Sequence, residues 1–202
     1  GIRVPLHGLL HAKGQTKTYF IRRFDRGRKG KKFAVEDFAQ LLQKTRDTKY
    51  DSSMEQVAKT LDYCSFPIIE SKELFRRVVF CYLVGNEDMH LKNFSLITRD
   101  GKTTLAPAYD LLNSSLVLSD PEESALPLNG KKRNLTKNDF LNYFAKERLA
   151  LPEKSILAVL SDIRNALAEW ERLIERSFLS EEMKGSYREL LEQRLARLGI
   201  RA

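Results

Sequence analysis

Three polar residues near the middle of the chain have the types and the spacing that phosphoryl transfer requires. Asn93 stands five positions after Asp88, and Asp110 follows further along the chain. Transfer of phosphate from ATP needs a carboxylate that orients the attacking hydroxyl and accepts its proton, together with oxygen ligands for Mg²⁺. Asn93 and Asp110 offer the hard oxygen ligands that Mg²⁺ prefers. We therefore expect these two residues to bind the metal and Asp88 to face the hydroxyl.

The segments around these residues should bring them together. Residues 94–98 and 103–106 are predicted strands, and the Asp-Gly pair between them strongly favours a tight hairpin turn. An antiparallel hairpin returns its second strand to the level where the first began, so Asn93 and Asp110 should lie side by side. Asp88 stays in the preceding loop, where it is free to face a substrate.

Each of these residues also has a purely structural explanation. Asp88 could form a turn, Asn93 could bond its own backbone at a strand edge, and Asp110 could cap the segment that follows it. The Asp-to-Asn spacing alone occurs by chance in many proteins. The structural explanations account less well for all three residues within one helix–loop–hairpin–loop unit. His90 and Lys92 add a donor and a cation to the same loop, although His90 alone would more often be structural.

The rest of the chain is predicted to be mostly helical. Ser71 should cap a buried helix that ends at Gly85, and residues 35–43 have helical spacing with Glu36 and Asp37 in the first turn. Further helices are expected where Ser53 caps residues 54–61, from Thr136 to Phe144, along the apolar stripe from Ile156 to Ile174, and over the last residues from Tyr187 to Leu198. An aromatic strand is predicted from Thr18 to Phe24.

Composition restricts the class of protein. The chain has 202 residues, of which 42% are hydrophobic, which suffices for one substantial core. Cys64 and Cys81 have too few partners for a zinc site and are predicted to be buried free thiols, as in a reducing cytoplasm. There is no apolar run of membrane-spanning length and no signal peptide. The first residue is Gly rather than Met, so we expect a fragment or a processed product.

The formal net charge of +8 raises the question of an acidic partner. Basic residues are dense at positions 26–32 and again at 131–133. Each cluster alone is better explained as a solvated loop, and the alternative is a rim that attracts phosphate, an acidic partner or nucleic acid.

Four segments resemble a known family, the HipA-type serine/threonine kinases that act as toxins of bacterial toxin–antitoxin pairs. Residues 85–95, with the sequence GNEDMHLKNFS, are similar to the catalytic loop of that family, G-x-x-D-x-H-x-K-N-F-S. Residues 106–110 resemble its metal-binding P-x-Y-D segment, and residues 23–26 resemble its R-F-D-R hinge. Residues 128–136 are similar to a glycine-basic turn. The resemblance extends from about Thr18 to the C-terminus, and the catalytic loop is its most specific part.

The resemblance implies a role for each matching residue. Asp88 would be the general base or hydroxyl-orienting group, and Asn93 and Asp110 would bind Mg²⁺. The residues expected to contact ATP are Arg22, Arg23, Phe24, Asp25, His90, Leu91, Lys92, Asn93, Tyr109 and Asp110. The first three would offer backbone groups to adenine, and Asp25 would lie near the ribose. Many family members have Glu at the position of Arg22, a change that a backbone contact would survive.

Two features of the family are missing. The glycines do not form a phosphate-binding G-x-G-x-x-G loop, and only Lys13 and Lys17 are candidates for the lysine that contacts the α- and β-phosphates. In the family both features precede the hinge. We therefore predict an α+β, mostly α fold: a protein-kinase-like C-terminal helical lobe with small β-hairpins. Residues 1–34 would be the hinge strand and a remnant of the N-lobe, which is otherwise absent, and residues 35–202 the C-terminal lobe.

The predicted activity is ATP- and Mg²⁺-dependent phosphorylation of a Ser or Thr hydroxyl on a protein in the cytoplasm. The resemblance implies an aminoacyl-tRNA synthetase as a candidate target and a DNA-binding antitoxin of the HipB type as a candidate partner, so that nucleic acid would be met only indirectly. A separate small N-lobe-like protein is a further candidate partner. Two alternatives remain: a kinase for small molecules, and an inactive lobe retained to bind a partner or nucleic acid.

Overall fold

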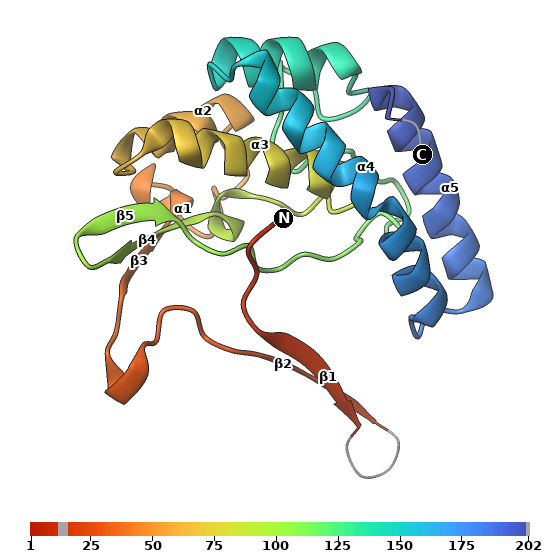
Figure 1. Ribbon diagram of the computed structural model, residues 1–202, viewed down its shortest axis with the longest axis horizontal. Helices are drawn as coiled ribbons and strands as arrows, with labels where there is room; N and C mark the ends of the chain where they lie inside the picture. Colours follow the sequence, from red (N-terminus) through yellow and green to blue (C-terminus); the bar gives the residue numbers. More distant parts are fainter. Residues whose placement is uncertain (12–15, 201–202) are drawn as a thin grey trace.

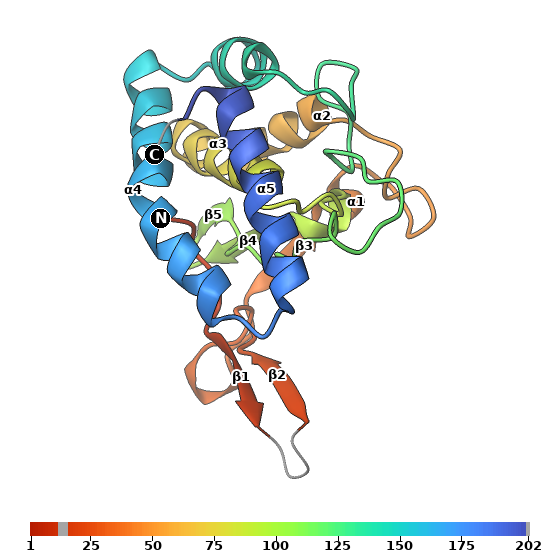
Figure 2. The same cartoon turned by 90° about the vertical axis from the view of Figure 1, so that its right-hand side faces the viewer.

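A helical body and a projecting hairpin make up the molecule. The structure is a computed structural model that describes residues 1–11 and 16–200. Helices α3 (Pro67–Leu83), α4 (Glu153–Arg176) and α5 (Glu181–Leu198) pack against one another, and the small strands lie along one side of α3 (Figure 1). The hairpin of β1 (His7–His11) and β2 (Lys17–Ile21) extends away from this body (Figure 2).

Helix α3 forms the centre of the body, because apolar residues surround nearly its whole C-terminal half. Leu74, Phe75, Val79 and Leu83 are all fully buried. The helix begins at Pro67 rather than after Ser71, so the predicted N-cap is wrong. Proline suits the first turn because its fixed φ is already helical and its missing N–H would have no helical partner. Ser71 instead lies buried inside the helix.

A three-stranded antiparallel sheet follows the order β3 (Ala34–Asp37), β4 (Ser95–Arg99), β5 (Lys102–Leu105). The predicted hairpin is confirmed, and its turn residues Asp100 and Gly101 both have positive φ, as a two-residue hairpin turn requires. Strand β3 corrects the helix predicted over residues 35–43. The first three residues of that range, 35–37, pair with β4 instead, and only α1 (Phe38–Leu41) is helical. Asp37 is the N-cap of α1, in a capping box with Gln40.

The remaining predicted helices are present. Ser53 caps α2 (Met54–Lys59), which continues into the 3₁₀ turn η2 (Thr60–Tyr63). Asp139 exchanges hydrogen bonds with Thr136 at the start of the next helix, whose main part, η4 (Asp139–Arg148), has π geometry. Short 3₁₀ turns also occur as η1 (Arg28–Gly30) and η3 (Leu91–Asn93). The stripe from Ile156 to Ile174 packs α4 onto the core.

Strand β2 is shorter than predicted, because pairing with β1 ends at Ile21 and leaves Arg22–Phe24 beyond the sheet. The sequence did not indicate β1 itself. Every residue of β2 is exposed. A two-stranded hairpin with both faces in water is marginally stable on its own.

Both cysteines are buried free thiols, as predicted. Burial raises the pKa of each thiol to about 12. Among the residues that the structure describes, no helix is both long enough and apolar enough to cross a membrane.

Candidate functional site

The loop between α3 and β4 holds the predicted catalytic residues. It opens at Gly85, whose φ of +75° is in the region that favours glycine. A Cβ atom built there would lie only 2.7 Å from Oδ1 of Asn113. The Gly85 carbonyl accepts hydrogen bonds from the backbone N–H groups of Ser114 and Ser115, at 2.9 and 3.1 Å. The loop is therefore joined at its first residue to the segment that follows Asp110.

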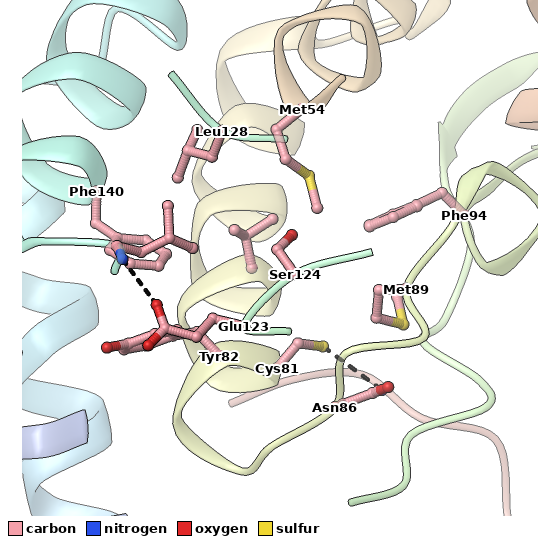
Figure 3. Close-up of a pocket in the computed structure, with 12 residues that line it drawn as sticks. Met54, Cys81, Tyr82, Asn86, Met89, Phe94, Glu123, Ser124, Leu128 and Phe140 are labelled. Atoms are coloured by element: carbon pink, nitrogen blue, oxygen red, sulfur yellow. Dashed lines mark hydrogen bonds between the residues drawn. The ribbon is translucent and has the colours of Figure 1, made fainter. Parts of the chain in front are cut away.

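Three apolar side chains of this loop anchor it to the hydrophobic core. Met89, Leu91 and Phe94 are at most 2% exposed. Figure 3 shows Met89 and Phe94 beside Met54 of α2, close to Cys81 of α3. Of the polar residues between them, His90 and Asn93 are each 5% exposed, whereas Lys92 is exposed. Leu91 was expected to contact the nucleotide, but the whole residue is fully buried.

Asn86 connects the parts of the predicted site. Its Oδ1 accepts a hydrogen bond from the backbone N–H of Asp88 at 3.3 Å, and its Nδ2 donates to the backbone carbonyl of Asp110 at 3.2 Å. The same amide also approaches Sγ of Cys81 at 3.9 Å (Figure 3). Asn86 is buried, so these bonds are protected from water. Asn86 lies within the predicted catalytic motif, although no role was predicted for it.

The side chain of Asp88 is half-buried and has a partner that was not predicted. The Tyr50 hydroxyl donates a hydrogen bond to Oδ1 of Asp88 at 2.6 Å. Burial, followed by the hydrogen bond to Asp88 and the charge of Asp88, raises the pKa of Tyr50 to about 12. Tyr50 comes from the loop before α2, in which no candidate site residue was predicted.

Asn93 and Asp110 present oxygen atoms that suit a divalent cation. Asn93 donates from Nδ2 to the Asp88 backbone carbonyl at 2.8 Å, which fixes the amide. No hydrogen bond within residues 1–11 and 16–200 engages its Oδ1. The Asp110 residue is exposed, with a φ of +56°. One or two protein oxygens with phosphate oxygens and water form a common Mg²⁺ site. The donor set therefore fits the predicted metal. In the described part of the chain, no group of three or more His, Cys, Asp or Glu side chains is arranged so that it could hold a metal ion by itself.

Two charged side chains of helix α3 position the backbone that leads to Asp110. The buried Glu70 carboxylate accepts a hydrogen bond from the Leu105 backbone N–H at 3.1 Å. The buried guanidinium of Arg77 donates to the Ala106 carbonyl at 2.7 Å. Burial raises the pKa of Glu70 and lowers that of Arg77 to about 10. These two bonds hold the end of β5 against α3, and the residues after it reach the loop between α3 and β4, where Asp110 contacts Asn86.

Opposing influences act on the pKa of His90. Burial lowers the pKa of this imidazole, as does the positive charge of Lys49, while Asp88 and Asp110 both act to raise it. Its Nδ1 is buried without a hydrogen-bond partner among the described residues. Its ring packs edge-on against Tyr50, with 5.0 Å between ring centroids. His90 is therefore neutral near pH 7 and supports the position of Tyr50.

Lys92 and Tyr109 contact residues from outside the loop. The Lys92 ammonium forms a salt bridge of 3.1 Å with Asp37, a residue to which sequence reasoning gave no part in the site. The Tyr109 hydroxyl donates to the Lys92 carbonyl at 2.9 Å and contacts the Ser95 hydroxyl. Burial raises the pKa of Tyr109. The ring of Tyr109 stacks on Phe24, with 5.5 Å between centroids. This contact joins the predicted hinge to the predicted metal segment.

The hinge backbone is partly engaged within the protein. The Arg22 N–H donates to the Leu6 carbonyl at 2.7 Å, and the Phe24 carbonyl accepts from Arg99 at 2.7 Å. Among the described residues, no hydrogen bond engages the Arg22 carbonyl or the Phe24 N–H. An acceptor and a donor two residues apart can pair with one edge of adenine.

Asp25 is held in an exposed cluster of charges. Arg23 forms a two-pronged contact with its carboxylate at 2.9 and 2.6 Å, and Arg26 adds a third bond at 2.6 Å. The hydrogen bond from Arg23 lowers the pKa of Asp25. Lys17 is exposed in β2, and its ammonium lies over the Phe178 ring. Lys13 lies outside the described residues.

The basic residues at 131–133 are paired with acidic side chains. Lys131 contacts Asp139, Lys132 contacts Glu122, and Arg133 contacts Asp120. This pairing favours the interpretation of the turn as a structural element over that of an anion-binding rim.

Relatives of the chain are named as kinases. Y4dM, a suspected kinase of Sinorhizobium fredii, is 35% identical over 155 residues, which are 75% of this chain and 37% of that protein. A suspected kinase of Haemophilus influenzae is 34% identical over 128 residues, which are 57% of this chain and also 37% of the relative. The chain thus spans little more than a third of the length of these relatives.

Solved structures share the fold. The Shewanella oneidensis toxin HipA, solved in complex with HipB and operator DNA, superposes with a TM-score of 0.78 at 21% identity, over 98% of this chain and 53% of HipA. The Helicobacter pylori proinflammatory kinase CtkA gives a TM-score of 0.64 at 19% identity, over 97% of this chain and 78% of CtkA.

The family comparison agrees with these likenesses. Residues 1–170 match the family model described as HipA-like C-terminal domain. The structural neighbours confirm the predicted fold class, which is α+β, mostly α, with a kinase-like C-terminal helical lobe and small β-hairpins. The predicted family is confirmed as well: this chain belongs to the HipA-like C-terminal domain family.

Proposed function

We propose that the protein containing this chain is a serine/threonine protein kinase that uses ATP and Mg²⁺. The observation that carries the proposal is the bonding of Asn86 to both Asp88 and Asp110, because it joins the predicted hydroxyl-orienting residue to the predicted metal segment. Phosphoryl transfer depends on positioning and on charge neutralisation more than on covalent chemistry by the protein. A fixed carboxylate next to a metal site meets that need.

Each residue has a role in this proposal. Asp88 orients the substrate hydroxyl through one carboxylate oxygen and accepts its proton, while the other oxygen holds the Tyr50 hydroxyl. Asn93 and Asp110 hold Mg²⁺, which when bound neutralises charge on the phosphates. Arg22 and Phe24 pair with adenine through their backbone, and Tyr109 supports Phe24 by stacking. His90, Leu91, Lys92 and Asp25 complete the nucleotide site, with Lys92 held near it by Asp37.

The proposal includes the division of the chain and its partners. Residues 1–34 form the hinge and part of an N-lobe, which agrees with a hairpin that leaves all of β2 in water. Residues 35–202 form the C-terminal lobe. HipA was solved with HipB and DNA, so a DNA-binding antitoxin of that type is the proposed partner. A small N-lobe-like protein is a second possible partner, and an aminoacyl-tRNA synthetase is the proposed substrate.

The test compares wild-type protein with Asp88→Ala for Mg·ATP binding and for phosphate transfer, using this chain and the full-length protein. We expect Asp88→Ala to retain nucleotide binding and to lose transfer by several orders of magnitude. Asp100→Ala, which removes an exposed carboxylate at the hairpin tip, is the matched control. A full-length wild-type protein that phosphorylates neither itself nor any other protein would contradict the proposal. Parallel assays on purified synthetases and on small alcohols separate a protein kinase from a small-molecule kinase.

A further inference from the structure

A cavity of about 560 Å³ opens beside Asp88, and acidic side chains dominate its charged lining. Glu87, Asp120 and Glu122 line it together with Asp88, whereas Arg133 is its single basic residue among those that the structure describes. The volume is within the usual range of ligand sites. The chain has a formal net charge of +8. The charge around this cavity is therefore opposite in sign to the net charge of the chain.

Glu87 distinguishes this cavity from a group of exposed acidic residues, because its carboxylate is buried and one oxygen is unpaired among the described residues. The residue is 7% exposed, and its Oε1 is buried without a hydrogen-bond partner among the described residues. An unpaired buried carboxylate oxygen is costly. Burial raises the pKa of Glu87, while the Ser115 hydroxyl, the Glu122 backbone and the charge of Arg194 oppose that rise. Arg194 itself donates to the Tyr82 carbonyl and to Ser115, so it does not form a salt bridge with Glu87.

The other walls indicate what kind of cation the cavity suits. Leu112, Leu118 and Ala125 contribute apolar surface next to the carboxylates. A Lys or Arg side chain combines an apolar stem with a charged end, and it buries the stem along such surface. The protein already contains one such contact in this cavity, because Arg133 forms two hydrogen bonds of 2.7 Å to Asp120. A bare divalent cation fits less well, since no cluster of three or more metal-binding side chains exists within the described residues.

We propose that this cavity binds a Lys or Arg side chain of the substrate polypeptide, next to the Ser or Thr that Asp88 orients, with Glu87 as its main partner. The inference deepens the proposed function and rests on it for the identity of the ligand as a protein substrate. Bound in this way, a basic side chain gives Oε1 of Glu87 the partner that it lacks and places the neighbouring hydroxyl at Asp88. The substrate class is therefore a polypeptide with a basic residue close to the phosphorylated hydroxyl.

The experiment compares two capped synthetic peptides that contain one Ser flanked either by Lys or by norleucine, which has the same stem without the ammonium group. Binding to this chain is measured by calorimetry without nucleotide, and phosphate transfer is measured separately with the full-length protein. We expect the Lys peptide to bind at least about tenfold more tightly, as one charged hydrogen bond would give. The Glu87→Gln variant should lose this preference and bind the norleucine peptide as the wild-type protein does.

Two further variants keep the test decisive. Arg133→Ala removes the competing cation and frees Asp120, so it should increase the preference for the Lys peptide, even if Glu87→Gln fails to fold. Asp100→Asn removes an equal charge on the remote hairpin and should leave the preference unchanged. Equal binding of the two peptides, or a preference unaffected by both Glu87→Gln and Arg133→Ala, overturns the inference. Absence of phosphate transfer together with a Glu87-dependent preference would instead contradict only the kinase activity.

Discussion

The Tyr50 hydroxyl donates a hydrogen bond of 2.6 Å to Oδ1 of Asp88, and the two residues are 38 positions apart in the chain. This contact joins the loop before α2 to the loop between α3 and β4. It leaves the second carboxylate oxygen of Asp88 for the substrate hydroxyl that the proposed function places there. Tyr50 also packs edge-on against His90, so its ring is held from two directions. We infer that Tyr50 is a positioning residue for Asp88.

The contact predicts how Tyr50 titrates. Burial and then the bond to Asp88 raise its pKa to about 12, because both disfavour the charged phenolate. Removing the carboxylate in Asp88→Ala should lower the pKa of Tyr50, although not fully to 10, since burial remains. Ultraviolet absorbance of tyrosinate during a pH titration measures this change, and Tyr50→Phe identifies the transition that belongs to Tyr50.

The same shift has a consequence for stability. The folded pKa of Tyr50 lies above its unfolded value of about 10, so its contribution is complete below pH 10 and is lost as the pH rises through about 12. Tyr50→Phe should therefore unfold with less pH dependence in this window than the wild-type protein. An unchanged Tyr50 pKa in Asp88→Ala would show that the two side chains do not interact in solution.

Asp110→Asn should weaken nucleotide binding only when Mg²⁺ is present. The substitution removes the charge that attracts the cation, whereas Asn tolerates the positive φ of +56° better than most residues. We expect the affinity for Mg·ATP to fall on the order of tenfold or more. Binding of ATP in excess chelator should not change. Calorimetry with and without Mg²⁺ measures both quantities.

Asp100→Asn is the matched control for this substitution. Asp100 also has a positive φ, 49°, but it lies at the exposed tip of the β4–β5 hairpin and pairs with Lys31. It should therefore bind Mg·ATP as the wild-type protein does. Equal affinity for Mg·ATP in Asp110→Asn and the wild-type protein would remove Asp110 from the metal site.

Local sequence signals were sufficient for the hairpin and for the end of α3 at Gly85. The Asp-Gly pair strongly favours a tight two-residue turn, so the hairpin can be predicted without knowledge of its tertiary contacts. Gly85 ends α3 because its positive φ suits the residue just beyond a helix. These features depend on neighbours in the chain, so the sequence is enough to predict them.

Features that depend on distant contacts were missed. Residues 35–43 have helical spacing, but Val35 pairs with Ile97 in the sheet, and this partner is invisible to a local pattern. Tyr50 stands in a polar segment without periodicity, and only the folded chain brings it to Asp88. Asn86 lies within the predicted catalytic motif, but its bonds to Asp88 and Asp110 depend on the fold of the loop and of the distant Asp110 segment.

The stacked pair of Phe24 and Tyr109 should couple the hinge to the body. The rings are half-buried, with centroids 5.5 Å apart and planes at 24°. We expect a double-mutant cycle of Phe24→Leu and Tyr109→Leu to give a coupling free energy of about 0.5–1.5 kcal/mol, as aromatic pairs do. Urea unfolding of the four proteins measures it. Tyr109→Phe is the control, because it keeps the ring and loses only the hydroxyl contacts.

Asp139 should contribute to stability in a way that depends on pH. Its carboxylate is buried and accepts hydrogen bonds from Asn129, Thr136 and Lys131. Burial would raise its pKa, but these bonds outweigh burial and lower the pKa from 3.8 to about 2. The ionised form is therefore favoured by folding. The resulting stabilisation, about 2 kcal/mol, is present above pH 4 and is lost as the pH falls through about 2.

Asp139→Asn should accordingly lower the free energy of unfolding by about 2 kcal/mol at pH 7, with a smaller loss at pH 3. The cause is local, since the amide of Asn would place a donor against donors that the carboxylate satisfies. Urea unfolding at the two pH values measures the difference, and Asp120→Asn, at an exposed ion pair with Arg133, should leave stability unchanged. A loss in Asp139→Asn that is equal at both pH values would mean that side-chain packing, and not the charge of Asp139, holds the turn against the helix.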